Sequence, residues 1–305
     1  MPDGTTTMLA EIQALRRQRH AVILAHNYQV NEVQEVADFV GDSLELSMKA
    51  AQLREPEVIV FCGVDFMAET AKLLAPEKTV LLPDPHAGCP MADMVTPEAL
   101  RSLKAAHPDV PAVCYVNTSA AVKAECDITC TSANAIQVVE SLRTKEAIFV
   151  PDRNLGDWVQ RHTATRLILW PGFCPTHQRL MPEQILTAKA AHPGAEVMIH
   201  PECPAELRDL ADHVASTGGM VRLARERTVK EFIVVTEEGM LHRLRTDNPQ
   251  KLFHGLTPSA MCPNMKKITL EKVYWALQDM QYAVVVPDEI AERARQAIER
   301  MLAIS

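Results

Sequence analysis

The sequence predicts an α/β fold of three similar parallel-sheet units, arranged with pseudo-threefold symmetry around one central active site. Three observations predict it. Short apolar runs alternate with helical stretches, which is the pattern of parallel sheets covered by helices. Three Cys-Pro pairs recur at nearly equal spacing, and polar residues that end strand-like runs recur with nearly the same period. A fixed period of this kind indicates repetition of one structural unit.

The Cys-Pro pairs mark the end of each predicted unit. They lie in the runs VLLPDPHAGCP, LILWPGFCP and LFHGLTPSAMCP, at Cys89, Cys174 and Cys262. Each follows a strand-like run and a loop that contains proline. A fourth Cys-Pro, at Cys203, falls out of phase with the other three.

Other features keep the same phase. Strand-like runs that end in polar residues occur at AVILAHNYQ, AVCYVNTSA and EVMIHPECP. Small polar residues precede the helical stretches that follow: Ser43, Ser132 and the pair Ser216-Thr217. A further strand is predicted each time, at VIVFCG, AIFVPD and FIVVTE. Each unit is therefore expected to contain strand, helix, strand, helix, strand and then Cys-Pro.

The repeats divide the chain into residues 1–106, 107–192 and 193–282, with a C-terminal helix in 283–305 that we expect to pack on the body. The first unit begins with an amphipathic helix rather than a signal peptide. A net charge of −8 argues against a nucleic-acid partner, and no apolar run is long enough to span a membrane. We therefore expect a cytoplasmic protein, in which disulfides are a poor explanation for eight cysteines.

The three in-phase cysteines are the candidate metal ligands. Ligands bind beyond the carboxyl ends of strands in such sheets, so three equivalent loops would meet there. Three thiolates fit either a zinc site, which usually has a fourth protein ligand, or a 4Fe–4S cluster with one open iron. His177 is a possible fourth ligand, which would weaken the case for an open iron. Cys126 and Cys130 are expected to be simply buried or to have a redox side role.

The strand ends supply the candidate acid–base groups and hydrogen-bond donors. They are His26, Tyr28, Tyr115, Asn117, His200 and Glu202. Glu202 is the one carboxylate in this set, so we expect it to carry protons. Burial near an anionic cluster should raise its pKa.

The serines and Thr217 at predicted helix starts have two compatible interpretations. They can cap the helices, and Asp42 with Glu45 resembles a capping box. They can also present hydroxyls and free N–H groups to an anionic substrate. A nucleotide cofactor is not predicted, because the chain has neither a G-x-G-x-x-G fingerprint nor a P-loop.

Taken together, the motifs resemble those of the quinolinate synthase family. AHNYQ, GDSLELS, CGVDFMAETAK, AGCPMADM, YVNTSA, CTSANA, VPDRNLG, FCPTH, HPEC, STGGM and MCPNMKKI occur in that order between about residues 20 and 280. The resemblance implies the threefold α/β architecture and one 4Fe–4S cluster on Cys89, Cys174 and Cys262. It also implies a reaction, in which iminoaspartate and dihydroxyacetone phosphate condense to quinolinate with loss of phosphate and two waters, in NAD biosynthesis.

The resemblance also implies roles for individual residues. The catalytic residues would be Glu202, Tyr28, His26 and His200. The substrate-binding residues would be His26, Ser43, Tyr115, Asn117, Ser132, His200, Glu202, Ser216 and Thr217. An aspartate-oxidising enzyme would supply iminoaspartate. Two alternatives stay open: an iron–sulfur hydro-lyase acting on a small carboxylic acid, and a non-enzymatic iron–sulfur sensor.

Overall fold

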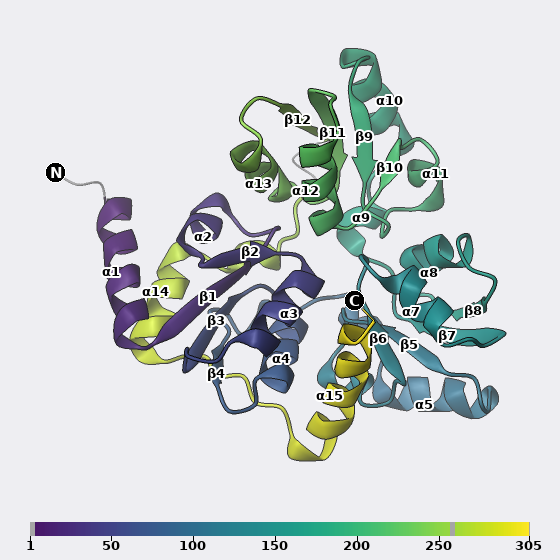
Figure 1. The fold of residues 1–305 in the computed structure, drawn as a ribbon, viewed down its shortest axis with the longest axis horizontal. Helices are drawn as coiled ribbons and strands as arrows, with labels where there is room; N and C mark the ends of the chain where they lie inside the picture. Colours follow the sequence, from purple (N-terminus) through teal and green to yellow (C-terminus); the bar gives the residue numbers. More distant parts are fainter. Residues whose placement is uncertain (1–3, 257–259, 305) are drawn as a thin grey trace.

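Three parallel sheets of four strands each confirm the predicted α/β fold (Figure 1). The computed structural model describes residues 4–256 and 260–304; residues 257–259, within the third Cys-Pro run, lie outside the described part. The strand orders are β2-β1-β3-β4, β6-β5-β7-β8 and β10-β9-β11-β12. The same order therefore recurs in each unit, as the spacing of the motifs predicts. The unit boundaries at 106, 192 and 282 remain predictions.

Each unit alternates strands and helices. The first contains β1 (Ala21–His26), α2 (Asn31–Val36), β2 (Phe39–Gly41), α3 (Ser43–Gln52), β3 (Val58–Cys62), α4 (Asp65–Leu74) and β4 (Thr79–Leu81). The second contains α5 (Pro97–Ala106), β5 (Ala112–Tyr115), α6 (Ala120–Lys123), β6 (Ile128–Cys130), α7 (Ala135–Ser141), β7 (Glu146–Val150), α8 (Arg153–Gln160) and β8 (Arg166–Leu169). The third contains α10 (Pro182–Ala191), β9 (Glu196–Ile199), α11 (Ala205–Arg208), β10 (His213–Val214), α12 (Thr217–Glu226), β11 (Glu231–Val235), α13 (Met240–Asp247) and β12 (Leu252–Gly255).

The central strands form because their residues are apolar on both faces. All five residues of β3 are buried, and five of the six in β1. Burial on both faces is typical of parallel sheets covered by helices. The expectation of three strands per unit is wrong, since a short strand (β2, β6 or β10) also pairs with the first strand of each sheet. These strands have only two or three residues, which is too few for a recognisable pattern.

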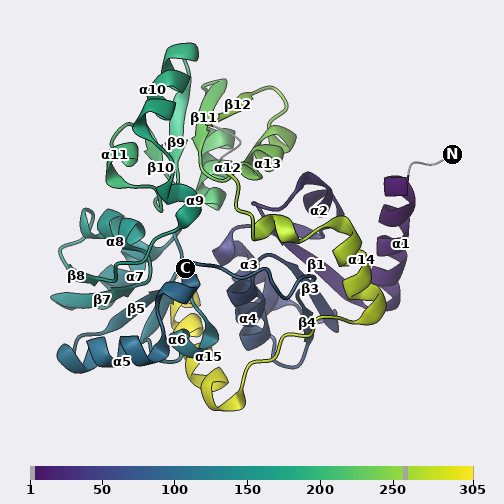
Figure 2. The same ribbon diagram turned by 180° about the vertical axis from the view of Figure 1, so that it is seen from behind.

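The helices outside the repeats join the units. Helix α1 (Gly4–Gln18) buries Ile12, with Leu9 and Leu15 packed against the same core, as the amphipathic pattern predicts. Helix α14 (Leu270–Asp279) lies against α1, although the two helices are far apart in the chain. Helix α15 (Asp288–Leu302) packs on α4 of the first unit and on α6 and β6 of the second (Figure 2). Within the described residues, no helix has the length and apolarity needed to cross a bilayer.

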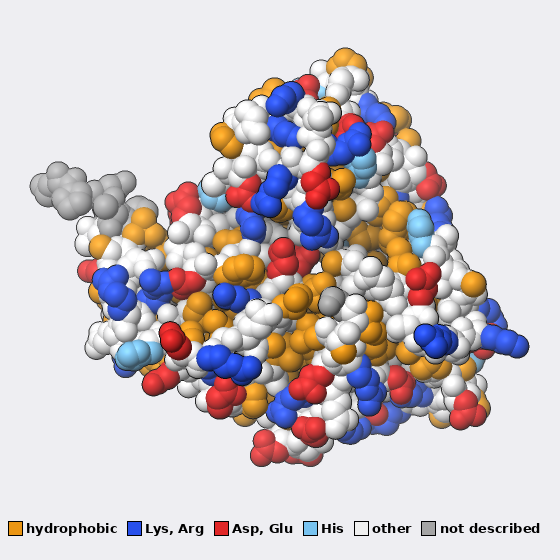
Figure 3. Space-filling model, in the orientation of Figure 1, with side chains coloured by type: hydrophobic (Ala, Val, Ile, Leu, Met, Phe, Trp, Pro, Cys, Tyr) orange, Lys and Arg blue, Asp and Glu red, His pale blue; other side chains and the backbone are white. Residues whose placement is uncertain are grey.

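The three units surround a common centre. In Figure 1 the third unit lies at the top, the first at the lower left and the second at the lower right. The space-filling view shows hydrophobic side chains gathered where the units meet (Figure 3). The three Cys-Pro pairs, which come after β4, β8 and β12, lie in this region. A short helix follows each cysteine: η1 (Ala92–Met94), α9 (Pro175–Gln178) and η2 (Met265–Lys267).

Candidate active site

A cavity of about 160 Å³ lies between the three units, and residues of all three line it. Cys89, Cys174 and Cys262 are among them. So are most of the predicted substrate and acid–base residues: His26, Tyr28, Ser43, Tyr115, Asn117, Ser132, His200, Glu202 and Thr217. Ser216 does not line the cavity; its hydroxyl instead contacts Asp42 Oδ2 at 3.2 Å. The threefold repeat therefore brings together side chains that are far apart in the sequence.

The three cysteine loops share a local geometry. Backbone N–H groups just after each cysteine point at its sulfur: those of Met91 and Ala92 at Cys89, and that of His177 at Cys174. The N–H groups of Asn264 and Met265 point at Cys262 in the same way. A thiolate accepts such bonds better than a thiol does, so each loop is prepared for a negatively charged sulfur.

Burial acts on the same thiols in the opposite direction. It raises the pKa of Cys89 to about 12, with further contributions from Glu202 and Cys262, and it also raises the pKa values of Cys174 and Cys262. A coordinated metal cation reverses this effect, because it deprotonates a ligating thiol. Three converging sulfurs with N–H donors therefore fit a cluster held by three thiolates.

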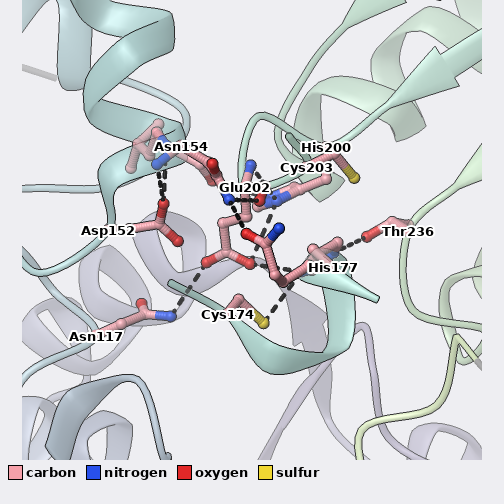
Figure 4. A network of polar contacts seen from close by, with 12 residues as sticks. Asn117, Asp152, Asn154, Cys174, His177, His200, Glu202, Cys203 and Thr236 are labelled. Atoms are coloured by element: carbon pink, nitrogen blue, oxygen red, sulfur yellow. Dashed lines mark hydrogen bonds and ion pairs between the residues drawn. The ribbon is translucent and has the colours of Figure 1, made fainter. Parts of the chain in front are cut away.

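Glu202 lies at the centre of a polar network (Figure 4). The side chain is 4 % exposed. Its Oε1 accepts a hydrogen bond from the Tyr115 hydroxyl at 2.8 Å, with Asn117 Nδ2 at 3.5 Å, and its Oε2 lies 2.8 Å from His177 Nδ1. The carboxylate thus joins residues of the second and third units at the cavity wall.

The predicted direction of the Glu202 pKa shift is wrong. Burial does raise this pKa, but the neighbouring imidazoles of His200 and His177 and hydrogen bonds from His177 and Tyr115 outweigh it, and the pKa falls to about 2. Hydrogen bonds donated to a carboxylate stabilise its charged form even when the donors are neutral. Glu202 is therefore a carboxylate across the physiological pH range.

His26 and His200 occupy equivalent places and share a hydrogen-bonding pattern. The N–H of Tyr28 points at Nδ1 of His26 at 3.1 Å, and the N–H of Glu202 points at Nδ1 of His200 at 3.4 Å. Burial lowers the pKa of each ring to about 3. A neutral ring that accepts at Nδ1 carries its proton on Nε2. Both histidines can therefore donate a hydrogen bond from Nε2, which in His200 lies 3.2 Å from Ser132 Oγ.

A chain of short contacts links Tyr28 to Glu202. The Tyr28 hydroxyl lies 2.6 Å from Thr236 Oγ1, which lies 2.9 Å from Nε2 of His177. Nδ1 of His177 contacts Glu202 Oε2, and it lies 3.2 Å from Cys174 Sγ. Burial, together with the nearby charge of Glu202, raises the pKa of Tyr28 well above its usual value, so its hydroxyl stays protonated. The ligand atoms of Cys174, His177 and Glu202 all lie within 4.8 Å of one another, so this group could also hold a metal ion and His177 stays a possible fourth ligand.

Lys266 and Glu237 fasten the third cysteine loop to the first unit. Lys266 Nζ lies 2.8 Å from Glu237 Oε1 and donates to the Tyr28 carbonyl at 2.6 Å. The same Glu237 oxygen accepts the N–H of Cys262 at 2.9 Å, and Oε2 accepts the N–H of Gly239 at 2.7 Å. The Glu237 side chain is fully buried. This ion pair therefore positions Cys262 relative to Tyr28.

The predicted helix caps are only partly correct. Asp42 and Glu45 form the expected capping box at the start of α3, where Ser43 is the first helical residue rather than the cap. Ser216 does cap α12, but the cap of α7 is Asn134 and not Ser132. Gly218, the residue after Thr217, lets the carboxylate of Asp42 approach the start of α12, and Asp42 Oδ2 accepts the Gly218 N–H at 3.2 Å.

Sequence reasoning missed several residues of the site. Thr236 and Glu237 follow β11, and Asp152 follows β7, so the strand-end rule could have found them had it been applied to the third strand of each sheet. Asp152 Oδ2 is buried and has no hydrogen-bond partner among the described residues. Arg179 gave no signal in the sequence; it is the one Lys or Arg among the described residues that line the cavity.

The remaining cysteines stay outside the cavity. Cys126 and Cys130 are buried, as expected, but they do not share a helix, because Cys130 lies on β6. Cys203, the out-of-phase Cys-Pro, is buried in the core of the third unit. The spacing of the repeat thus correctly distinguished the three cysteines that line the cavity from these three, which do not.

Comparison with known proteins agrees with this arrangement. The family model of NadA, the quinolinate synthetase A protein, matches residues 10–303. A protein of Dehalococcoides mccartyi named quinolinate synthase is 57 % identical over 97 % of this chain and 97 % of its own length. Proteins of the same name from Thermodesulfovibrio yellowstonii and Methanoregula boonei are each 55 % identical, over 96 % and 99 % of this chain and 97 % and 100 % of their own lengths. The chain therefore belongs to the quinolinate synthetase A family of enzymes, as the motifs indicate.

Proposed function

We propose that the protein is a quinolinate synthase of NAD biosynthesis, which condenses iminoaspartate with dihydroxyacetone phosphate and releases phosphate and two waters. The observation that carries this proposal is the cavity where three cysteines from equivalent loops meet neutral histidines, a tyrosine and an ionised carboxylate. Cys89, Cys174 and Cys262 would hold one 4Fe–4S cluster. When bound, such a cluster with one open iron supplies a Lewis acid that helps a hydroxyl group to leave.

The cavity residues suit two anionic substrates. His26 and His200 present N–H donors, and Ser43, Ser132 and Asn117 add neutral donors at the same wall. Asn117 Oδ1 is buried without a hydrogen-bond partner among the described residues, so the amide can still bind a substrate donor. Arg179 is exposed and can attract a phosphate or carboxylate from the rim. Holding both substrates in one small cavity turns their encounter into an effectively unimolecular step.

Glu202 and Tyr28 would divide the proton transfers. Formation of the carbon–carbon bond requires an enamine, which forms when a proton leaves the carbon next to the imine of iminoaspartate. Glu202 is ionised, so it is suited to accept that proton. Tyr28 stays protonated and is suited to donate a proton to a leaving oxygen. General acid–base catalysis by one such group typically contributes about 10²–10⁴-fold.

An anaerobic assay tests the proposal. Oxaloacetate and ammonia serve as the source of iminoaspartate, and dihydroxyacetone phosphate is added with the purified protein. We expect quinolinate and phosphate to form in equal amounts. Water elimination from a small carboxylic acid, without phosphate release or quinolinate, would identify a hydro-lyase instead. A cytoplasmic location and an aspartate-oxidising enzyme as supplier of iminoaspartate remain predictions.

A further inference from the structure

Two histidines and one carboxylate converge on the surface of the third unit, outside the cavity. His192 caps the C-terminus of α10, Glu231 begins β11, and His254 lies on β12. His192 Nδ1 and His254 Nε2 each lie 2.8 Å from the same oxygen, Glu231 Oε1. The two rings stack with their centroids 3.6 Å apart. None of the three residues lines the central cavity.

The backbones that carry these side chains are fixed. Strands β11 and β12 pair in parallel, with Glu231 opposite Leu252 and Ile233 opposite His254. The N–H of His192 donates to the Ala188 carbonyl at 2.9 Å, and its carbonyl accepts from Ala195 at 3.0 Å. The three side chains are 32 %, 28 % and 27 % exposed, in chain order, so an ion from solvent can reach them.

Two imidazoles and a carboxylate form a common ligand set for zinc. All three ligand atoms lie within 4.8 Å of one another. Zinc binds such atoms at about 2.0–2.2 Å, which requires the atoms to be about 3–3.5 Å apart. His192 Nδ1 and His254 Nε2 lie 2.8 Å from Glu231 Oε1, so these two distances need to increase only slightly to reach this spacing. The rings must also turn out of their stack so that each lone pair points at the ion, and their exposed edges leave room for this.

We propose that His192, Glu231 and His254 bind one divalent transition-metal ion of the zinc class. Glu183 and Arg245 line the adjoining groove with opposite charges, so their effects on a cation tend to cancel. A bound ion would connect the end of α10 to β11 and to β12, which is an edge strand of the third sheet. This site is independent of the proposed cluster and of quinolinate formation.

Equilibrium dialysis against zinc tests the proposal. Holoenzyme with its full iron content is used, so that the cavity cysteines are occupied. We expect wild type to retain one zinc per chain, and His254→Ala and Glu231→Gln to weaken zinc binding by at least about tenfold. His213→Ala is the matched control, because it removes another His–Glu pair of the same unit, with His213 Nε2 2.8 Å from Glu196 Oε2. It should leave zinc binding unchanged.

Thermal unfolding provides a second measurement. Zinc should raise the midpoint of wild type and of the His213→Ala control, because an ion that binds only the folded state stabilises it. It should not raise the midpoint of either site variant. The proposal is overturned if wild type retains no zinc, or if the site variants and the control bind zinc as wild type does.

Discussion

Replacing Lys266 with Met should destabilise the protein by up to about 3 kcal/mol. Removing one partner of a buried ion pair typically costs about 3–5 kcal/mol, because the other charge stays buried. Here the loss in free energy of unfolding has an upper limit, because Glu237 can become neutral by binding a proton. Protonating a carboxyl with an ordinary pKa of 4.5 at pH 7 costs about 3 kcal/mol. Burial already raises the pKa of Glu237 in wild type, so part of this cost is present before the substitution. The N–H groups of Cys262 and Gly239 still stabilise the carboxylate, so the loss should lie below this limit.

The pH dependence of this loss follows from the direction of the Glu237 shift. Burial already raises the pKa of Glu237, and removal of Lys266 should raise it further. A carboxyl group whose folded pKa is raised destabilises the fold when ionised, and this penalty disappears as the pH falls through the folded pKa. The difference between variant and wild type should therefore shrink as the pH falls from 7 towards 4.5.

Urea unfolding of matched preparations measures the effect. Lys272→Met is the control, because its partner contact is as short, 2.6 Å to Asp84 Oδ2, but its side chain is 33 % exposed. Such a pair contributes about 1 kcal/mol or less. In the double variant Lys266→Met with Glu237→Gln, part of the lost stability should return. The reasoning is refuted if Lys266→Met costs no more than Lys272→Met and the double-mutant cycle shows no coupling.

Two further substitutions test the cavity. Glu202→Gln should keep the iron but lose about 10²–10⁴-fold in the rate of quinolinate formation, because an amide cannot accept the proton. The control Glu206→Gln changes an exposed residue on the next helix and should have wild-type activity. An equal loss of activity in both variants would contradict the role assigned to Glu202. Gly218→Ala should cost about 1–3 kcal/mol in urea unfolding, since a Cβ would lie 2.6 Å from Asp42 Oδ2. The control Gly194→Ala should leave the free energy of unfolding almost unchanged, because no atom lies within 4 Å of the new Cβ. Similar urea midpoints for the two variants would count against close packing at Gly218.

The parts of the site that the sequence predicts are those that repeat. Cys89, Cys174 and Cys262 stand out because a symmetric fold places equivalent positions around one axis. His26 and Tyr115 stand out because apolar strands end in polar residues there. A period and a strand end are both local patterns, which a single sequence can show without any knowledge of packing.

The parts that the sequence does not predict depend on contacts between units. The pKa of Glu202 is set by Tyr115 and His177, which are distant in the sequence, so burial alone gave the wrong direction. The ion pair of Lys266 and Glu237 joins two loops of the third unit, and Lys266 also reaches the Tyr28 carbonyl of the first unit; neither residue repeats. Ser216 matched the period but turned toward Asp42, because side-chain direction is decided by the neighbouring unit.

Iron and acid-labile sulfide analysis of protein purified without oxygen tests the central claim most directly. Wild type should contain about four irons and four sulfides per chain, as one such cluster requires. Cys89→Ser, Cys174→Ser and Cys262→Ser should each lose the cluster. Cys114→Ser should keep it, because Cys114 is buried in β5 and does not line the cavity. Stoichiometric zinc without iron in wild type, or equal loss of iron in Cys114→Ser, would contradict the account.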